Sequence, residues 1–255
     1  MEMNKETLEK MSQMRLLGMY YAFKTSLERM NNESMTIDQF VAWLVSCEWD
    51  DRRNRTILRS VKNANFRYRA SVEEIDFSVE RGLDKNTMLR LAELGFVSEH
   101  KDLFITGSTG TGKSYIATAL GYQACQKGYK VLYANTAILM GMLKSAKAKG
   151  IILQELKKIE RADLLILDDF GIQPMDAQAR INLLDIIEDR HAKKSTIITS
   201  QMPVKNWYDV IGEKTIADAV LDRIVHQAVR IELFGESLRR TKIKKNVYFS
   251  ENIIY

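Results

Sequence analysis

The chain has 255 residues, of which 45% are hydrophobic and 28% charged, and its net charge of +5 corresponds to a pI near 9.0. This size and balance suit one large or two modest globular domains with a sizeable core, and the mild positive charge favours a polyanionic partner. No apolar run could span a membrane and the N-terminus lacks a secretory signal, so no membrane association is expected. The two cysteines lack metal-ligand spacing, which fits a reducing cytoplasm.

The first part of the chain is predicted to be helical. Residues 4–30 place apolar side chains at helical spacing, and a polar loop follows at residues 31–34. Thr36 and Gln39 make a capping box at the start of the next helix. That helix carries an apolar stripe: Phe40, Trp43, Leu44 and Cys47. Residues 1–69 are therefore predicted to form a small all-helical N-terminal domain that binds DNA or a partner.

The end of this domain is strongly basic, with seven Lys and Arg residues and no acidic residue between positions 52 and 69. Four of them share one face of a helix: Arg52, Arg55, Arg59 and Lys62. Charge of one sign repels itself over this length unless phosphates neutralise it, so the stretch is predicted to contact nucleic acid. An ordinary solvated face is the alternative.

The remainder of the chain, residues 70–255, is predicted to be an α/β domain. Residues 70–84 form a linker, and Asp84 is the expected N-cap of a helix that ends at Gly95. Strands are expected at residues 101–106, 130–133, 164–167, 196–199 and 229–233. Helices are expected at residues 113–127, 151–159, 177–192 and 217–226, with another beginning over 138–143. This alternation predicts a parallel sheet sandwiched by helices.

A glycine-rich loop joins the first of these strands to a helix, with the pattern G-x-x-x-x-G-K-[ST] over residues 107–114. Loop N–H groups and the helix N-terminus attract phosphates. Lys113 is expected to bring its charge to the β- and γ-phosphates, and the Ser114 hydroxyl to ligate Mg²⁺. The predicted nucleotide contacts are Gly107, Ser108, Thr109, Gly110, Thr111, Gly112, Lys113, Ser114 and Tyr115.

Two carboxylates follow the apolar strand at residues 164–167. The carboxyl ends of parallel strands form the ligand-binding edge of such a sheet. Asp168 is therefore predicted to hold Mg²⁺ through its water shell, and Asp169 to orient and polarise the attacking water. A pair of helix N-capping residues before the turn at Gly171 is the alternative.

Two later polar residues are further candidates. Gln201 ends a strand and could sense the γ-phosphate or hold the water, or it could simply belong to a turn before Pro203. Arg223 lies on the helix before the last strand and could reach a neighbouring subunit's nucleotide as an arginine finger. An intrahelical or structural ion pair is the competing interpretation.

The blocks at residues 107–114, 164–169, 199–201 and 222–223 resemble AAA+ ATPases in order and spacing. With residues 75–78 and 82–85 ahead of the loop, the chain resembles IstB-type transposition helper ATPases, relatives of DnaC-type helicase loaders, over essentially its whole length. The resemblance implies that ATP, with Mg²⁺, is hydrolysed to ADP and phosphate. It also implies a homo-oligomer assembled with ATP on duplex DNA, largely independently of sequence, and recruitment and activation of a transposase.

The resemblance carries expectations for individual residues. It makes Arg223 a finger acting on a neighbouring subunit, and it places a DNA-facing helix at Lys144, Lys147 and Lys149. Asp169 stands where most relatives have Glu, one methylene longer. Only residues 235–255 follow the last strand, too few for a C-terminal helical lid, and Arg239 is the best candidate for a lid arginine that contacts ATP.

Two other functions fit parts of these patterns. A replicative helicase loader of the DnaC type would share the ATPase core and use its N-terminal domain to grip a hexameric helicase. A small-molecule kinase with the same phosphate loop would need an acceptor pocket with a base and a lid, and neither is visible in the sequence. The basic stretch and the predicted finger argue against the kinase.

Overall fold

The computed structural model describes residues 2–29 and 35–238. The chain forms two compact units, divided between Arg59 and Ser60. We call residues up to 59 the N-terminal unit and those from 60 onward the C-terminal unit. Within the described residues, no helix is both long and apolar enough to cross a membrane. Arg239 lies outside the described residues, as does any lid built from residues 239–255.

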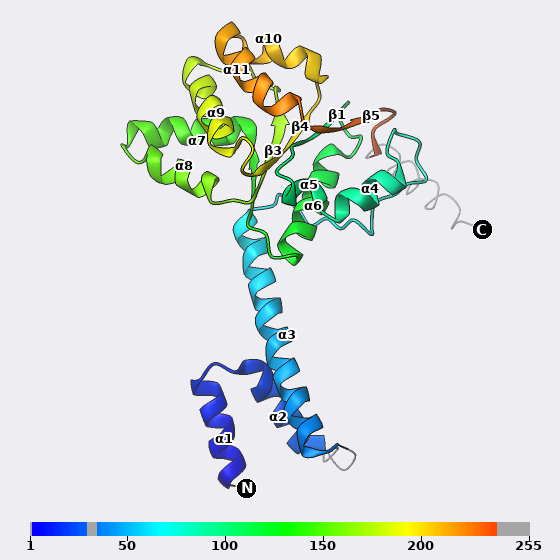
Figure 1. The fold of residues 1–255 in the computed structure, drawn as a ribbon, viewed down its shortest axis with the longest axis vertical. Helices are drawn as coiled ribbons and strands as arrows, with labels where there is room; N and C mark the ends of the chain where they lie inside the picture. The colour runs from blue at the N-terminus through cyan, green and yellow to red at the C-terminus, as the bar shows by residue number, and fades with distance from the viewer. Residues whose placement is uncertain (1, 30–34, 239–255) are drawn as a thin grey trace, which may run out of the picture. The chain divides into compact units, whose positions relative to one another are not determined.

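Helices make up the N-terminal unit: α1 (Glu2–Gln13), α2 (Leu17–Arg29) and the long α3 (Ile37–Ala64), whose last residues belong to the C-terminal unit (Figure 1). The prediction of one continuous helix over residues 4–30 is wrong. Arg15 adopts a left-handed φ of 58°, and the Leu16 amide donates to the Met11 carbonyl. This turn lets α1 and α2 pack against each other.

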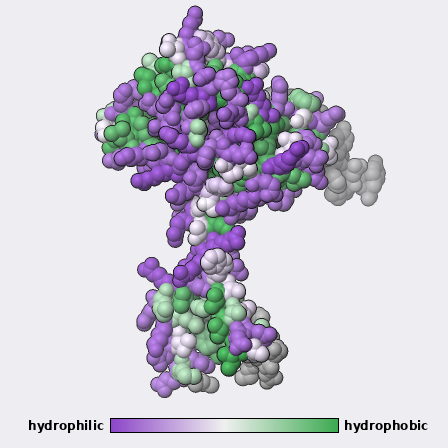
Figure 2. All heavy atoms as spheres, viewed as in Figure 1, coloured by the Kyte–Doolittle hydropathy of each residue, from purple (hydrophilic) through white to green (hydrophobic). Residues whose placement is uncertain are grey.

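The predicted start and apolar stripe of α3 are confirmed. Thr36 and Gln39 make the reciprocal capping box, with side chain-to-amide distances of 3.0 and 3.4 Å. Leu44 is buried, and the Phe40 ring packs near those of Phe23 and Trp43. Apolar residues also remain on the surface of this unit, where Ile37 is 83% exposed (Figure 2).

Five parallel strands form the sheet of the C-terminal unit, in the order β2-β3-β4-β1-β5 (Figure 1). They are β1 (Leu103–Gly107), β2 (Val131–Asn135), β3 (Leu164–Phe170), β4 (Ser195–Ser200) and β5 (Val229–Leu233). The predicted parallel sheet is thus confirmed. Because the strands run the same way, their carboxyl ends bring the loops after β1, β3 and β4 to one edge.

Helices cover both faces of the sheet, as predicted. They are α4 (Lys85–Ala92), α5 (Gly95–Ser98), α6 (Lys113–Gln126), α7 (Thr136–Ala148), α8 (Ile152–Glu160), α9 (Ala177–Arg190), α10 (Trp207–Ile211) and α11 (Lys214–Val225), with a short 3₁₀ turn η1 (Val204–Asn206). Alternation along β1 separates two cores: Leu103 and Ile105 pack with α6, whereas Phe104 packs with the helices of the opposite face.

The helix ahead of β1 differs from the prediction at its end. Asp84 is its N-cap, as expected, and accepts a hydrogen bond from the Thr87 amide at 2.7 Å. However, α4 ends at Ala92 rather than at Gly95, and Leu94 takes a left-handed conformation with φ of 62°. Leu94 is 1% exposed, so burial of its side chain in the core accompanies this unfavourable backbone geometry.

Candidate functional site

The glycine-rich loop between β1 and α6 has a backbone that only glycine accommodates easily. Gly107, Gly110 and Gly112 have φ values of 145°, 87° and 99°. A side chain at Gly107 would also collide with the Leu233 carbonyl of β5, 2.1 Å from the position of its Cβ. From the segment after β5, the Leu238 amide donates a hydrogen bond to the Gly110 carbonyl at 3.0 Å. The loop is therefore held in a curled conformation suited to a phosphate.

The lysine predicted to bind phosphates lies inside this loop. Lys113 is 6% exposed, and its ammonium donates to the Gly107 and Ser108 carbonyls, each at 2.7 Å. Burial lowers the pKa of Lys113, and the nearby Asp169 and Asp168 carboxylates oppose that shift. The loop thus contains a positive charge that phosphate oxygens can reach in place of the two carbonyls.

Asp168 is fully buried at the end of β3 and accepts hydrogen bonds from three hydroxyl groups. Ser114 and Thr199 donate to its Oδ1, the former at 2.8 Å, and Tyr133 donates to its Oδ2. A carboxylate next to a serine hydroxyl is the oxygen ligand set that Mg²⁺ prefers. The residues predicted for the metal, Ser114 and Asp168, are therefore brought together and suit it chemically.

The second carboxylate points to different partners. Asp169 has a left-handed φ of 60°, and its Oδ2 accepts a hydrogen bond from the Asn135 side chain at 3.1 Å. Burial raises the pKa of Asp169 and Asp168 raises it further, whereas the Arg67 and Lys113 charges oppose the shift. The result is a partly buried carboxyl group that binds a proton more readily than an ordinary aspartate does.

Gln201 is brought to the phosphate loop. Its side-chain oxygen accepts a hydrogen bond from the Thr109 hydroxyl at 2.7 Å. Tyr115 has the opposite outcome: its hydroxyl donates to Glu74 at 2.8 Å and its ring stacks on Tyr68. The phenol of Tyr115 is thus bound to the linker ahead of β1 rather than to the loop.

Arg223 lies on α11 and is engaged within its own chain. Its guanidinium forms an ion pair with Glu188 at 2.6 Å and donates to the Ala219 carbonyl at 2.7 Å. Within residues 2–29 and 35–238, it has no hydrogen bond or ion pair to the phosphate loop. The structural ion pair considered from the sequence is present, and a role toward another subunit stays a prediction.

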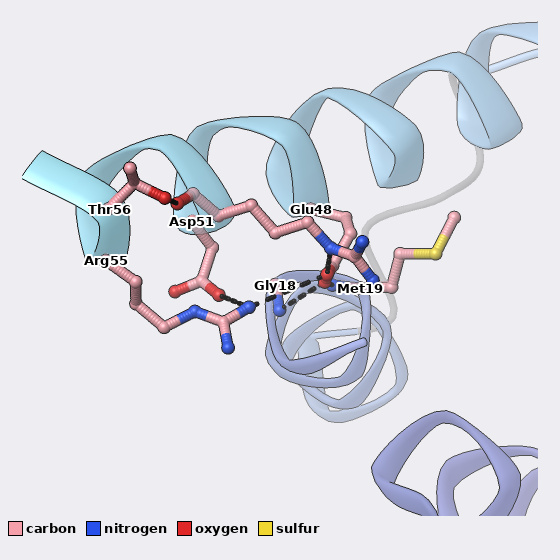
Figure 3. Close-up of polar contacts among 7 residues, drawn as sticks. Gly18, Met19, Glu48, Asp51, Arg55 and Thr56 are labelled. Atoms are coloured by element: carbon pink, nitrogen blue, oxygen red, sulfur yellow. Dashed lines mark hydrogen bonds and ion pairs between the residues drawn. The ribbon is translucent and has the colours of Figure 1, made fainter. Parts of the chain in front are cut away.

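Half of the predicted basic face on α3 is paired with carboxylates (Figure 3). Arg52 contacts Glu48 at 2.6 Å, and Arg55 contacts Asp51 at 2.7 Å. Glu48 also accepts hydrogen bonds from the amides of Gly18 and Met19 at the start of α2, which ties α2 to α3. Arg59 and Lys62, in contrast, form no ion pair with any described residue.

The second predicted DNA-facing set lies at the end of α7. Lys144 forms an ion pair with Asp176 at 2.6 Å, and Lys147 donates to the Gln178 side chain. Lys149 is the exposed C-cap of the helix. The first two lysines therefore connect α7 to the start of α9, and contact with DNA stays a prediction for all three.

Four site residues escaped the sequence analysis. Asn135 and Thr199 lie at the carboxyl ends of β2 and β4, where polar side chains were an available signal, and Tyr133 lies two residues before the end of β2. Arg81 carried no such signal. It is 5% exposed, donates to the Thr111 carbonyl at 3.0 Å, and has a buried Nε without a partner among the described residues. Arg81 therefore supports the loop from the linker side.

Comparison with known proteins agrees with this geometry. Residues 9–246 match the family described as IstB-like ATP binding protein. The chain belongs to this family. It is 40% identical to an insertion sequence ATP-binding protein, y4pL, of Sinorhizobium fredii, over 94% of this chain and 98% of that protein. It is 27% identical to the ATP-binding protein of insertion sequence IS21 of Pseudomonas aeruginosa, over 95% of this chain and 91% of that one.

Solved structures place this IstB-like chain in the AAA+ fold. The crystal structure of DnaI superimposes with a TM-score of 0.56 and 25% identity, covering 65% of this chain and 91% of that one. The predicted resemblance to IstB-type proteins and the AAA+ phosphate-loop fold are both confirmed.

Proposed function

We propose that this IstB-like protein is a Mg²⁺-dependent ATPase that assembles with further copies of itself on duplex DNA and recruits and activates a transposase. One observation carries the ATPase part: Lys113, Ser114 and Asp168 converge at the end of β1 and β3, with Asp169 beside them. The names of the two relatives reported above, both insertion sequence proteins, support the link to transposition.

In this proposal the chain's residues divide the work on ATP. The loop amides and Lys113 hold the phosphates, while Ser114 and Asp168 hold Mg²⁺, which when bound neutralises charge on the phosphoryl oxygens. Asp169 orients a water molecule and accepts its proton as the water oxygen attacks the γ-phosphorus. The bond from the γ-phosphorus to the bridging oxygen breaks, ADP and phosphate leave, and the proton passes from Asp169 to solvent.

The DNA part of the proposal depends on the basic face of α3. Arg59 and Lys62 are both exposed and form no ion pair with a carboxylate among the described residues, so phosphates can bind them directly. Arg52 and Arg55 must share their charge with Glu48 and Asp51. Phosphate contacts carry no sequence information, which supports binding that is largely independent of DNA sequence.

The test of the nucleotide site is Lys113→Ala. We expect ATP affinity, measured by titration calorimetry with Mg²⁺, to fall by about 100-fold or more, because the loop amides do not replace a charged hydrogen-bond donor. The matched control is Lys127→Ala, which removes an exposed lysine at the other end of α6 that pairs with Glu93. Equal affinities in the two variants would reject the assignment of the site.

A further inference from the structure

Tyr133 is placed to orient the metal-binding carboxylate. Its side chain is 5% exposed, and its hydroxyl donates to Oδ2 of Asp168, whereas the Ser114 and Thr199 hydroxyls both donate to Oδ1. Tyr133 is thus the hydroxyl donor to Oδ2 within the described part of the chain. Without it, Oδ2 would lose this hydrogen bond, and only the Ser114 and Thr199 contacts to Oδ1 would oppose rotation of the carboxylate about its Cβ–Cγ bond.

The ring of Tyr133 has a second neighbour that comes from outside the sheet. Phe66, two residues after α3, packs against it edge-on, with ring centroids 6.3 Å apart and an interplanar angle of 61°. The Phe66 ring also stacks on Tyr122 of α6 at 4.7 Å. A single aromatic ring therefore lies between the end of α3 and the residue that holds Asp168.

The segment after α3 is held tightly enough to transmit a displacement. Ala64, the last residue of α3, is fully buried in the core of the C-terminal unit. A Cβ on Gly121 of α6 would lie 2.6 Å from the Phe66 ring, so the ring approaches the backbone of α6 where only glycine leaves room. Close-packed side chains of this kind move together rather than independently.

We propose that Phe66 and Tyr133 form a positioning link through which the end of α3 acts on the Asp168 carboxylate. The inference rests on the proposed function, in which Asp168 holds Mg²⁺ during ATP hydrolysis. A shift of Phe66 tilts the Tyr133 ring and changes the hydrogen bond to Oδ2, which weakens steeply with angle. Groups that orient a metal ligand in this way govern metal affinity. Tyr133 and Phe66 are positioning residues, since neither belongs to the set that contacts ATP or Mg²⁺.

The test compares the Mg²⁺ requirement of ATP hydrolysis in full-length variants. Tyr133→Phe keeps the ring and removes only the hydroxyl, so we expect the half-saturating Mg²⁺ concentration to rise about tenfold or more. Binding of a fluorescent ATP analogue in EDTA should stay within about twofold of the unaltered chain, since the link acts on the metal ligand. The matched control is Tyr129→Phe, whose hydroxyl has no hydrogen bond among the described residues and which packs against the same core.

Phe66→Leu tests the second half of the link. We expect the half-saturating Mg²⁺ concentration to rise about threefold or more, and Phe66→Tyr, which keeps the ring, to restore it. Combined with Tyr133→Phe, the Phe66→Leu change should add nothing further, because both act through one hydrogen bond. Thermal unfolding of each variant separates this effect from a general loss of stability.

The outcomes distinguish this inference from the function beneath it. Equal Mg²⁺ requirements in Tyr133→Phe and Tyr129→Phe would overturn the role of Tyr133. Effects of Phe66→Leu and Tyr133→Phe that multiply would show that Phe66 acts independently, and would overturn the link. Failure of the unaltered chain to bind ATP with Mg²⁺ would instead reject the proposed function, and the link with it.

Discussion

At the scale of single residues, Asp169 is the most informative position in the site. Its φ of 60° is a conformation that aspartate tolerates better than most residues, and the hydrogen bond from Asn135 holds its carboxylate beside Asp168. Burial and the neighbouring Asp168 charge raise its pKa. A carboxylate with a raised pKa accepts a proton more readily, which suits the role proposed for Asp169.

Replacing Asp169 by asparagine should separate ATP binding from hydrolysis. Asp169→Asn keeps the size of the side chain and removes its basicity, so we expect turnover to fall by about 10²- to 10⁴-fold. ATP affinity measured by calorimetry should change little, and this serves as the internal control. A variant that turns over ATP at the normal rate would show that Asp169 does not accept the proton.

At the scale of secondary-structure elements, Arg190 joins the ends of three of them. It is 2% exposed at the end of α9 and donates to the carbonyls of Ile159 in the last turn of α8, of Ala162 just after α8, and of Ser195 in β4. Burial lowers the pKa of Arg190 to about 10, and the charge of Asp102 opposes that shift. Asp102 in turn accepts the Thr196 amide of β4 at 2.7 Å.

The pH dependence of stability tests the burial of Asp102. Burial raises the pKa of Asp102 from 3.8 to about 6, so its contribution to stability is full below pH 3.8 and is lost as the pH rises through about 6. Asp102→Asn removes that titration. Between pH 4 and pH 8, the unfolding free energy of the variant should therefore improve relative to the unaltered chain by up to about 3 kcal/mol.

Urea unfolding at several pH values measures this difference. Any loss from weakening the hydrogen bond from the Thr196 amide that does not vary with pH cancels when the two stability profiles are compared by shape. Asp163→Asn, at a carboxylate that accepts the Lys130 amide and pairs with Lys194, is a suitable control. Two parallel stability profiles for Asp102→Asn and the unaltered chain would contradict the raised pKa.

At the scale of the whole molecule, two predicted interfaces start from intramolecular ion pairs. Arg223 is held by Glu188, and the basic face of α3 is half neutralised by Glu48 and Asp51. A neighbouring subunit or a DNA phosphate must compete with these carboxylates. The Arg223–Glu188 pair is partly exposed, and surface pairs contribute about 1 kcal/mol or less, so assembly can displace it more readily than the contacts to the buried Glu48.

A mixing experiment tests whether Arg223 acts on another subunit. Arg223→Ala would supply an intact phosphate loop and Lys113→Ala an intact finger, so a mixture should recover part of the ATPase activity that each variant lacks alone. The measurement is phosphate release across mixing ratios. No recovery in mixtures shown by light scattering to co-assemble is the result that would exclude a role between subunits.

The salt dependence of DNA binding tests the face on α3. Changing Arg59 and Lys62 to Ala should reduce the steepness of log affinity against log salt concentration by about two units, because each phosphate contact that is lost removes about 0.9 from the slope. The matched control changes Arg52 and Arg55 to Ala. This control removes the same amount of charge, but from side chains that are already paired with Glu48 and Asp51. Fluorescence anisotropy on random duplexes measures both, and equal slopes in all three proteins would shift the interface to Lys144, Lys147 and Lys149.

The phosphate loop, the two carboxylates near the end of β3 and the parallel sheet that carries them could all be predicted from the sequence. These features are local: the loop needs glycine at positions with φ above 80°, and Asp168 and Asp169 directly follow the continuous apolar run of residues 164–167. Alternation of short apolar strands with helices was enough to predict the layers. Local pattern did not locate the break at Arg15, because α1 and α2 both carry apolar residues at helical spacing.

The groups that surround Asp168 became visible in the folded chain and not in the sequence. Tyr133 and Thr199 meet Asp168 from strands that lie on opposite sides of β3, and Phe66 reaches Tyr133 across 67 positions of sequence. The charges of Arg52 and Arg55 are offset by Glu48 and Asp51, which lie just ahead of the basic stretch and were not counted with it. These two pairs are i,i+4 neighbours on one helix, so helical spacing alone could have indicated them. The contacts of Tyr133, Thr199 and Phe66, in contrast, depend on the packing of distant segments and on side-chain rotamers, and neither leaves a periodic signal in the sequence.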